Sequence, residues 1–134
     1  MLHRIHHLNF VVHDLDDAVA RYSAAFSIDN WHHEDHPERP VKTARTKIGE
    51  SWLILVQPLD TDSPPARHLK EHGEGFFLVS FEVDDIEAAM AFAKQAGVSP
   101  IDEAARGGIL NWRVADLELQ KGRGPRLQLV EEKK

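Results

Sequence analysis

The sequence contains no cysteine, which excludes disulfide bonds, thiolate metal sites and cysteine nucleophiles. Basic residues are also in deficit: 16 Lys and Arg stand against 22 Asp and Glu, and they are scattered along the chain instead of gathered in a stripe. Proteins that bind nucleic acids depend on clustered cations to neutralise phosphates, so this class is disfavoured. The composition therefore predicts a small molecule or another protein as the partner.

Long apolar runs are missing too. No segment approaches the ~18 apolar residues of a membrane span, and the N-terminal MLHRIHHLNF lacks the apolar core of a signal peptide. We therefore expect a cytoplasmic protein. Its 134 residues are the size of one ordinary domain, which can bury about two thirds of the surface that its unfolded chain exposes.

What the sequence does contain is one strand-to-helix unit written twice. The stretch FFLVSFEVDDIEAAM, residues 76–90, alternates apolar and polar residues like a strand and then changes to the helical period. It overlays on HHLNFVVHDLDDAV at the start of the chain with one constant offset and no gap. In this overlay Asp85 matches Asp14, but Leu78 stands where the first copy has His7. The repeat indicates two similar modules.

Each copy begins a longer series of predicted elements. In the first half we expect a strand over 5–12, a helix over 15–26 capped by Asp14, and two strands over 41–48 and 51–58 joined at a Gly-Glu turn. The apolar residues of this helix form one stripe. They are Leu15, Ala18, Val19, Tyr22 and Phe26.

The second half repeats this order after a polar connection over 60–75, in which a short helix is expected near 66–71. The helix of the second half is expected to begin with a capping box from Asp84. Its predicted elements are a strand over 76–83, a helix over 86–96 and strands near 99–103, 109–119 and 125–132. We therefore predict an α+β domain of two tandem βαβββ modules, 1–59 and 76–134, whose sheets together enclose a cleft.

These residues resemble a known family. The segment DSPPARHLKEHGEG followed by FFLVSFEVDDIEAA is similar to the methylmalonyl-CoA epimerase branch of the vicinal oxygen chelate superfamily, which also includes glyoxalases, bleomycin-resistance proteins and extradiol dioxygenases. The resemblance implies a curved mixed sheet around a central cleft, and it implies a homodimer. Bleomycin-resistance proteins, similar in fold, bind their ligand without turnover.

The same resemblance implies one divalent metal ion, held by one side chain from each of four strands. The four corresponding positions in this sequence are His7, Ile54, Leu78 and Gln128. Aliphatic side chains have no lone pair to offer, and a catalytic ion needs about three protein ligands. We therefore predict that the chain holds no metal and needs no other cofactor.

The strand alternation predicts which side chains line the cleft. They are His7, Asn9, Trp52, Ile54, Val56, Leu78, Ser80, Glu82, Arg126 and Gln128. A largely apolar lining with a few polar groups suits an organic ligand better than a hydrated ion. Arg126 could pair with Glu82, clamp a ligand carboxylate or simply be solvated near the chain end.

Three residues are candidates for acid–base chemistry. His7 is either a general base or a hydrogen-bonded relic, and Glu82 is a second candidate. Glu38, in PERPV, resembles a segment near the catalytic carboxylate of epimerases, although an exposed loop acid fits as well. The nearby histidines of WHHEDHPE predict weak surface capture of a metal at most, because neighbours in an extended chain face opposite sides.

Three functions follow from these observations. The first is metal-independent binding of a small organic ligand, such as a carboxylate or an acyl thioester. The second is an epimerase, isomerase or lyase that uses His7, Glu38 or Glu82 as acid and base. The third is a structural or regulatory dimer whose cleft is filled by its own side chains.

Overall fold

The computed structural model describes residues 1–108, 110–119 and 124–132. By its internal contacts the chain divides into two compact units. Unit 1 comprises Met1–His7 and Leu78–Lys134, and unit 2 comprises Leu8–Phe77. Strands β1 (Leu2–Val11) and β5 (Gly75–Val83) contribute residues to both units.

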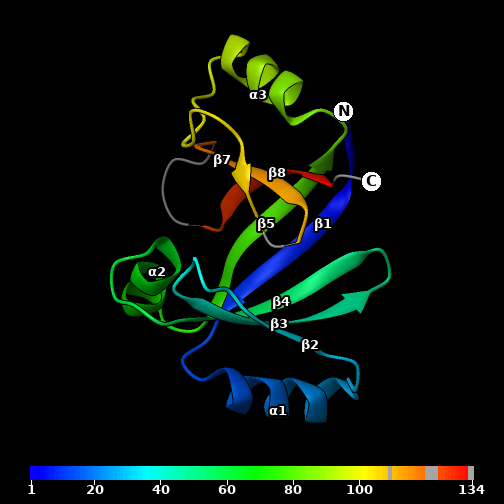
Figure 1. Ribbon diagram of the computed structural model, residues 1–134, viewed down its shortest axis with the longest axis vertical. Coiled ribbons are helices and arrows are strands. Elements are labelled where there is room, and N and C mark those ends of the chain that lie inside the picture. The colour runs from blue at the N-terminus through cyan, green and yellow to red at the C-terminus, as the bar shows by residue number, and fades with distance from the viewer. Residues whose placement is uncertain (109, 120–123, 133–134) are drawn as a thin grey trace. The chain divides into compact units, whose positions relative to one another are not determined.

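Unit 2 contains the first strand-helix copy and its sheet (Figure 1). After the end of β1 come α1 (Leu15–Phe26), β2 (His32–Asp35), β3 (Val41–Ile48), β4 (Ser51–Pro58) and α2 (Pro64–His72). The strand order is β2-β3-β4-β1, and β3 pairs antiparallel with both β2 and β4. The tight β3–β4 turn contains Gly49 at φ +57°, a left-handed conformation that glycine adopts without a steric penalty.

Helix α1 forms as its sequence predicts. The Asp14 side chain accepts a hydrogen bond from the Asp17 backbone N–H at 3.1 Å, which satisfies one of the free amides of the first turn. The buried Leu15 and Ala18 pack in a core cluster with Val12, Ala44 and Leu55. One member of the predicted stripe is misplaced, because Phe26 is 68% exposed. The helix ends at Phe26, so its ring meets Tyr22 of the preceding turn instead of the core.

This difference along one stripe is testable. Leu15→Ala should lower the free energy of unfolding by ~2–4 kcal/mol, since it leaves a cavity under the helix. Phe26→Ala removes a larger side chain, yet it should cost under ~1 kcal/mol because little apolar surface is re-exposed. Urea unfolding followed by circular dichroism measures both, and equal losses would contradict the burial of Leu15.

Unit 1 contains the second copy, with β5 followed by α3 (Ile86–Gln95), β6 (Arg106–Gly107), β7 (Trp112–Leu117) and β8 (Arg126–Glu132). The strand order is β1-β5-β8-β7-β6. This sheet is mixed, because β8 runs parallel to β5 but antiparallel to β7. Helix α3 covers one face (Figure 1). The core on this face contains Val83, Ile86, Ala89, Met90, Ala115 and Leu129.

Two predictions for unit 1 are wrong. The strand expected over 99–103 is a series of bends with one isolated bridge, Pro100 to Leu117, whose hydrogen bonds run from Ile101 N–H to the Asp116 carbonyl and from Glu118 N–H to the Ser99 carbonyl. The cap of α3 is Asp85, which accepts from the Ala88 N–H at 3.1 Å, and not Asp84. The expected strand over 109–119 is shorter, and residue 109 lies outside the described residues.

The other face of the unit 1 sheet, here called the polar face, carries polar side chains next to the buried Leu78, Val114 and Val130. Strand side chains alternate, so with Val83, Ala115 and Leu129 toward α3, their neighbours at even positions face away from the helix. The register places Ser80 beside Gln128 and Trp112 beside Glu132 on this face. Polar side chains so gathered on one buried face are the starting point for a functional site.

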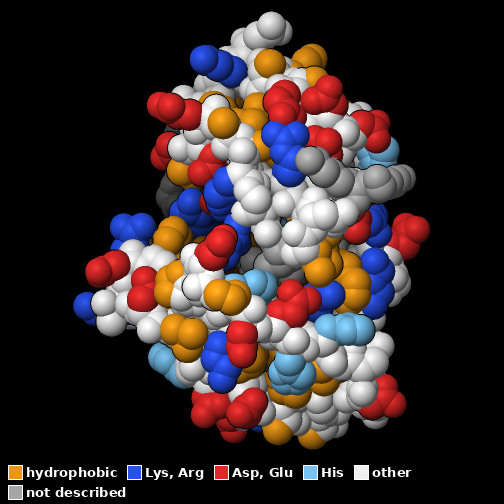
Figure 2. Space-filling model, viewed as in Figure 1, with side chains coloured by type: hydrophobic (Ala, Val, Ile, Leu, Met, Phe, Trp, Pro, Cys, Tyr) orange, Lys and Arg blue, Asp and Glu red, His pale blue; other side chains and the backbone are white. Residues whose placement is uncertain are grey.

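Charge is distributed as the sequence predicts. Figure 2 shows Lys and Arg side chains interspersed with Asp and Glu over the visible surface. Among the helices of the described residues, none has the length and apolar content to cross a membrane.

Candidate functional site

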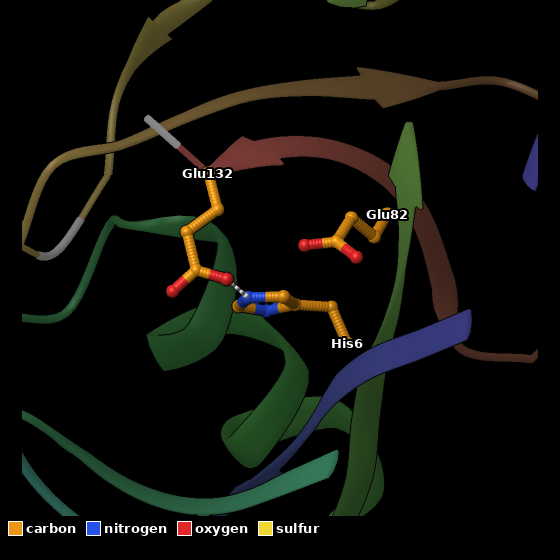
Figure 3. Close-up of side chains that lie close together, drawn as sticks. All are labelled: His6, Glu82 and Glu132. Atoms are coloured by element: carbon orange, nitrogen blue, oxygen red, sulfur yellow. Dashed lines mark hydrogen bonds and ion pairs between the residues drawn. The ribbon is translucent and has the colours of Figure 1, made fainter. Parts of the chain in front are cut away.

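His6 lies at the centre of a cluster on the polar face of unit 1. It comes from β1, Glu82 from β5 and Glu132 from β8, and the three side chains point toward one another (Figure 3). His6 Nε2 lies 3.1 Å from Glu132 Oε2, and the possible ligand atoms of all three lie within 4.8 Å of one another. His6 is fully buried, whereas both glutamates are partly exposed.

Arg4 supplies the positive charge of this cluster. Its Nε donates to Glu82 Oε1 at 3.0 Å and its Nη2 to Glu82 Oε2 at 3.3 Å. The same Nη2 donates to Glu132 Oε2 at 3.1 Å. One guanidinium thus binds both carboxylates, and a divalent ion at the His6–Glu82–Glu132 cluster would have to displace it.

His7 adjoins the cluster. It is 3% exposed, its Nδ1 lies 2.9 Å from His6 Nδ1, and its ring stacks on Trp112 at a centroid distance of 5.2 Å. Trp112 also meets the His6 ring edge-on at 4.5 Å. Both histidines contact one indole, so β1 departs here from the regular alternation that would send neighbours to opposite faces.

That departure explains why sequence reasoning missed His6 and Arg4. Alternation assigned even positions of β1 to the opposite side from His7. The sequence HRIHH, residues 3–7, could have indicated them, because it places three cationic or metal-ligating side chains, Arg4, His6 and His7, within four residues. Their partners, Glu82 and Glu132, are 78 and 126 or more positions away in the chain.

Burial makes both histidines poor bases. It is the main cause that lowers the pKa of His7 to about 3, His6 adds to this effect, and hydrogen bonding to Gln128 opposes it. Burial also lowers the pKa of His6, against the opposing effect of Glu132. For Glu132, burial acts to raise the pKa, but the His6 hydrogen bond and charge, with Trp112 and Arg4, bring it below its usual value.

A second network holds Gln128 and Arg126. Gln128 Nε2 donates to Asp116 Oδ1 at 2.9 Å, and Arg126 donates to Asp116 Oδ2 through Nε at 3.2 Å and Nη2 at 2.9 Å. Asp116 is buried and lies 3.5 Å from Arg106 as well. The suggested pair of Arg126 with Glu82 is therefore wrong, because each has another partner.

Two more predicted residues lie in unit 1. Leu78 is 4% exposed, and Ser80 is fully buried. The Ser80 hydroxyl has no hydrogen-bond partner in the part of the chain that the structure describes.

The remaining residues predicted to line the cleft belong to unit 2. Ile54 and Val56 are buried on β4, and the Asn9 Oδ1 is buried without a partner among the described residues. The Trp52 ring lies 4.8 Å from Arg45 Cζ and 4.6 Å from Lys47 Nζ, so cations cover it.

The acids and histidines before β3 form no metal site in the described structure. Glu38 is exposed in a turn. His36 Nε2 lies 2.9 Å from Thr43 Oγ1, whereas the ring of the exposed His32 meets Trp52 at 5.8 Å. His33, between them, is exposed.

Comparison with known proteins decides the family. The sequence model of the Glyoxalase/Bleomycin resistance protein/Dioxygenase superfamily matches residues 6–115. The chain belongs to this superfamily. Relatives within it include methylmalonyl-CoA epimerases: the bovine mitochondrial enzyme is 31% identical over 108 residues, which cover 80% of this chain and 62% of the bovine protein.

Two further relatives cover nearly the whole chain. The Bacillus subtilis protein YqjC, of uncharacterised function, is 25% identical over 98% of this chain and 94% of its own length. A variant of Streptomyces coelicolor methylmalonyl-CoA epimerase, solved in complex with 2-nitronate-propionyl-CoA, superposes with a TM-score of 0.89 at 30% identity, covering 98% of this chain and 99% of that one. The predicted α+β glyoxalase/bleomycin-resistance fold is confirmed.

The residues present do not fit the metal that the superfamily resemblance implies. Of the four positions, Ile54 and Leu78 are buried hydrocarbons at 3% and 4% exposure. The Gln128 amide donates to Asp116, and His7 Nδ1 is engaged with His6. One imidazole and one amide oxygen are too few donors to replace the hydration of a divalent ion.

Proposed function

We propose that this superfamily member binds a small organic acid derivative, an acyl thioester or a carboxylate, without a divalent metal ion. The observation that carries the proposal is the pair of buried aliphatic side chains, Ile54 and Leu78, at positions where the resemblance implies ligands. An acyl-CoA analogue bound to the Streptomyces relative supports the ligand class. We include in the proposal the homodimer that the resemblance implies, which light scattering tests.

The environments of the candidate acids and bases favour binding over turnover. A general base works best with a pKa near the operating pH, and burial lowers the pKa of His7 to about 3. Both oxygens of Glu82 accept hydrogen bonds from the Arg4 guanidinium, so this carboxylate is already engaged. Glu38 is exposed in a turn. The alternative of an epimerase, isomerase or lyase therefore rests on residues poorly placed for proton transfer.

Calorimetry with acyl-CoA esters tests the proposal. Protein purified without an affinity tag and treated with EDTA should bind butyryl-CoA or propionyl-CoA with the same Kd as protein supplied with Mn²⁺. A ligand at ~100 Kd should also raise the free energy of unfolding by about 2.7 kcal/mol, visible as a thermal shift.

Two results would count against the proposal, each in a different way. Binding that disappears with EDTA and returns with Mn²⁺ would show that a metal is needed. No thermal shift with any carboxylate or acyl-CoA would instead favour the third possibility, a protein whose cleft is filled by its own side chains.

A further inference from the structure

Two buried oxygen atoms on the polar face of unit 1 lack partners within the part of the chain that the structure describes. Among the described residues, neither Ser80 Oγ nor Gln128 Oε1 has a hydrogen-bond partner. Ser80 and Gln128 are register partners on the parallel strands β5 and β8, so their side chains stand next to each other on the face away from α3. A buried polar atom without a partner destabilises the folded protein, and a bound group of matching chemistry would remove that penalty.

The hydrogen bonds of the two histidines determine where their protons lie. Glu132 is ionised and only accepts, so the proton between it and His6 belongs to His6 Nε2. Burial keeps His6 neutral at pH 7 by lowering its pKa, and its Nδ1 is then an acceptor. The contact of 2.9 Å between the two Nδ1 atoms therefore requires that His7 Nδ1 carries a proton and donates it.

His7 Nε2 is consequently left with a lone pair. His7 Nδ1 is engaged with His6, so His7 Nε2 is the nitrogen that remains for Gln128. Hydrogen bonding to Gln128 acts to raise the pKa of His7, which means that it favours the protonated ring. In the neutral ring both His7 Nε2 and Gln128 Oε1 are acceptors, with no hydrogen between them. This explains why Gln128 Oε1 lacks a donor among the described side chains although His7 adjoins it.

We propose that Glu132, His6 and His7 form a hydrogen-bond relay that presents the His7 Nε2 lone pair beside Gln128 Oε1, so that the pair accepts a hydrogen bond from the hydroxyl of a hydroxyacyl ligand. His6 is a positioning residue in this arrangement, and Ser80 Oγ–H donates to the ligand oxygen. The ligand class rests on the proposed function, whereas the relay is a property of the free protein.

The surrounding charges favour a neutral donor group. Two adjacent acceptors repel a carboxylate, and the negative charge of Asp116 behind Gln128 is already matched by Arg126 and Arg106. At Gln128 an ammonium group would thus meet no unmatched carboxylate. A hydroxyl donates one hydrogen to the acceptor pair and accepts one from Ser80, which satisfies the chemistry of the described side chains.

The relay is tested by nuclear magnetic resonance of histidine labelled with nitrogen-15. Long-range proton–nitrogen correlations should show His6 protonated at Nε2 and His7 protonated at Nδ1 in the free protein. His6→Leu removes the acceptor of His7 Nδ1–H, so His7 should switch to the Nε2–H tautomer and donate to Gln128. His3→Leu, on the same strand but partly exposed and paired with Asp84, is the matched control and should leave His7 unchanged.

Calorimetry then tests the ligand class. The protein should bind 2- or 3-hydroxybutyryl-CoA at least about tenfold more tightly than butyryl-CoA, since only the former satisfies the buried acceptors. Ser80→Ala should reduce this preference severalfold without lowering the unfolding temperature, because the hydroxyl that it removes has no partner among the described residues.

Each failure has a separate meaning. A His7 protonated at Nε2 in the wild-type protein would overturn the relay, whatever binds. Equal affinity for butyryl-CoA and both hydroxybutyryl-CoA esters would overturn the hydroxyl site and leave the proposed function standing. Absence of binding by all three esters would refute the proposed ligand class while the tautomers of the free protein remain a test of the relay.

Discussion

Acidification from pH 7 to pH 3 should lower the free energy of unfolding, with His7 alone responsible for roughly 4 kcal/mol of the loss, at about 1.4 kcal/mol per pKa unit. Burial lowers the pKa of His7 in the folded protein to about 3, while in the unfolded chain it returns to 6.5. Between pH 6.5 and about pH 3, His7 therefore binds a proton in the unfolded chain but not in the folded protein. This difference in proton binding favours unfolding. The loss accumulates down to about pH 3, and His6, whose pKa is also lowered, acts in the same direction.

Substitution isolates the contribution of His7. The free energy of unfolding of His7→Gln should fall less steeply between pH 6.5 and pH 4 than that of the wild type, because the group that binds the proton is gone. His33→Gln, at an exposed position of β2, should retain the wild-type slope. Urea titrations at several pH values provide the curves, and parallel curves for His7→Gln and the wild type would contradict the burial of a neutral His7.

The second large effect is a gain of metal binding. The double variant Leu78→His and Gln128→Glu, together with His7, would offer three nitrogen or oxygen donors within unit 1, at positions that the family resemblance implies. Manganese and cobalt take such mixed imidazole and carboxylate sets. We expect one Mn²⁺ or Co²⁺ ion per chain in the double variant and none in the wild type, measured by calorimetry and elemental analysis after gel filtration.

A single substitution serves as the control for that experiment. Gln128→Glu adds a carboxylate but leaves Ile54 and Leu78 in place, so it should not hold a stoichiometric ion. The interpretation of the wild-type site would be refuted if wild-type protein, purified without an affinity tag, already carried an ion that His7→Gln abolishes.

Local signals determined much of the fold. The bounds predicted for α1, β3 and β4 match those observed, since apolar periodicity, the Asp14 cap and the turn at Gly49 all act within a few residues. Around 99–103 the same reasoning failed, because a short apolar pattern does not show how far pairing extends, and this segment forms only one bridge, to Leu117. The predicted burial of Phe26 was wrong for another reason. Periodicity shows which side chains share one face of a helix, but it does not show where along the helix that face stops contacting the core.

The sequence by itself determined which chemistry the chain cannot perform, because the functional groups of a side chain do not depend on the fold. No cysteine chemistry is possible, and Ile54 and Leu78 cannot bind a metal wherever they lie. Only the tertiary structure decided which polar groups meet. Arg4 reaches Glu82 and Glu132 across most of the chain, and His6 turns to the same side as His7 against the rule of alternation. Hydrogen bonds and ion pairs depend on distances of about 3 Å, and no local pattern specifies such distances between residues far apart in sequence.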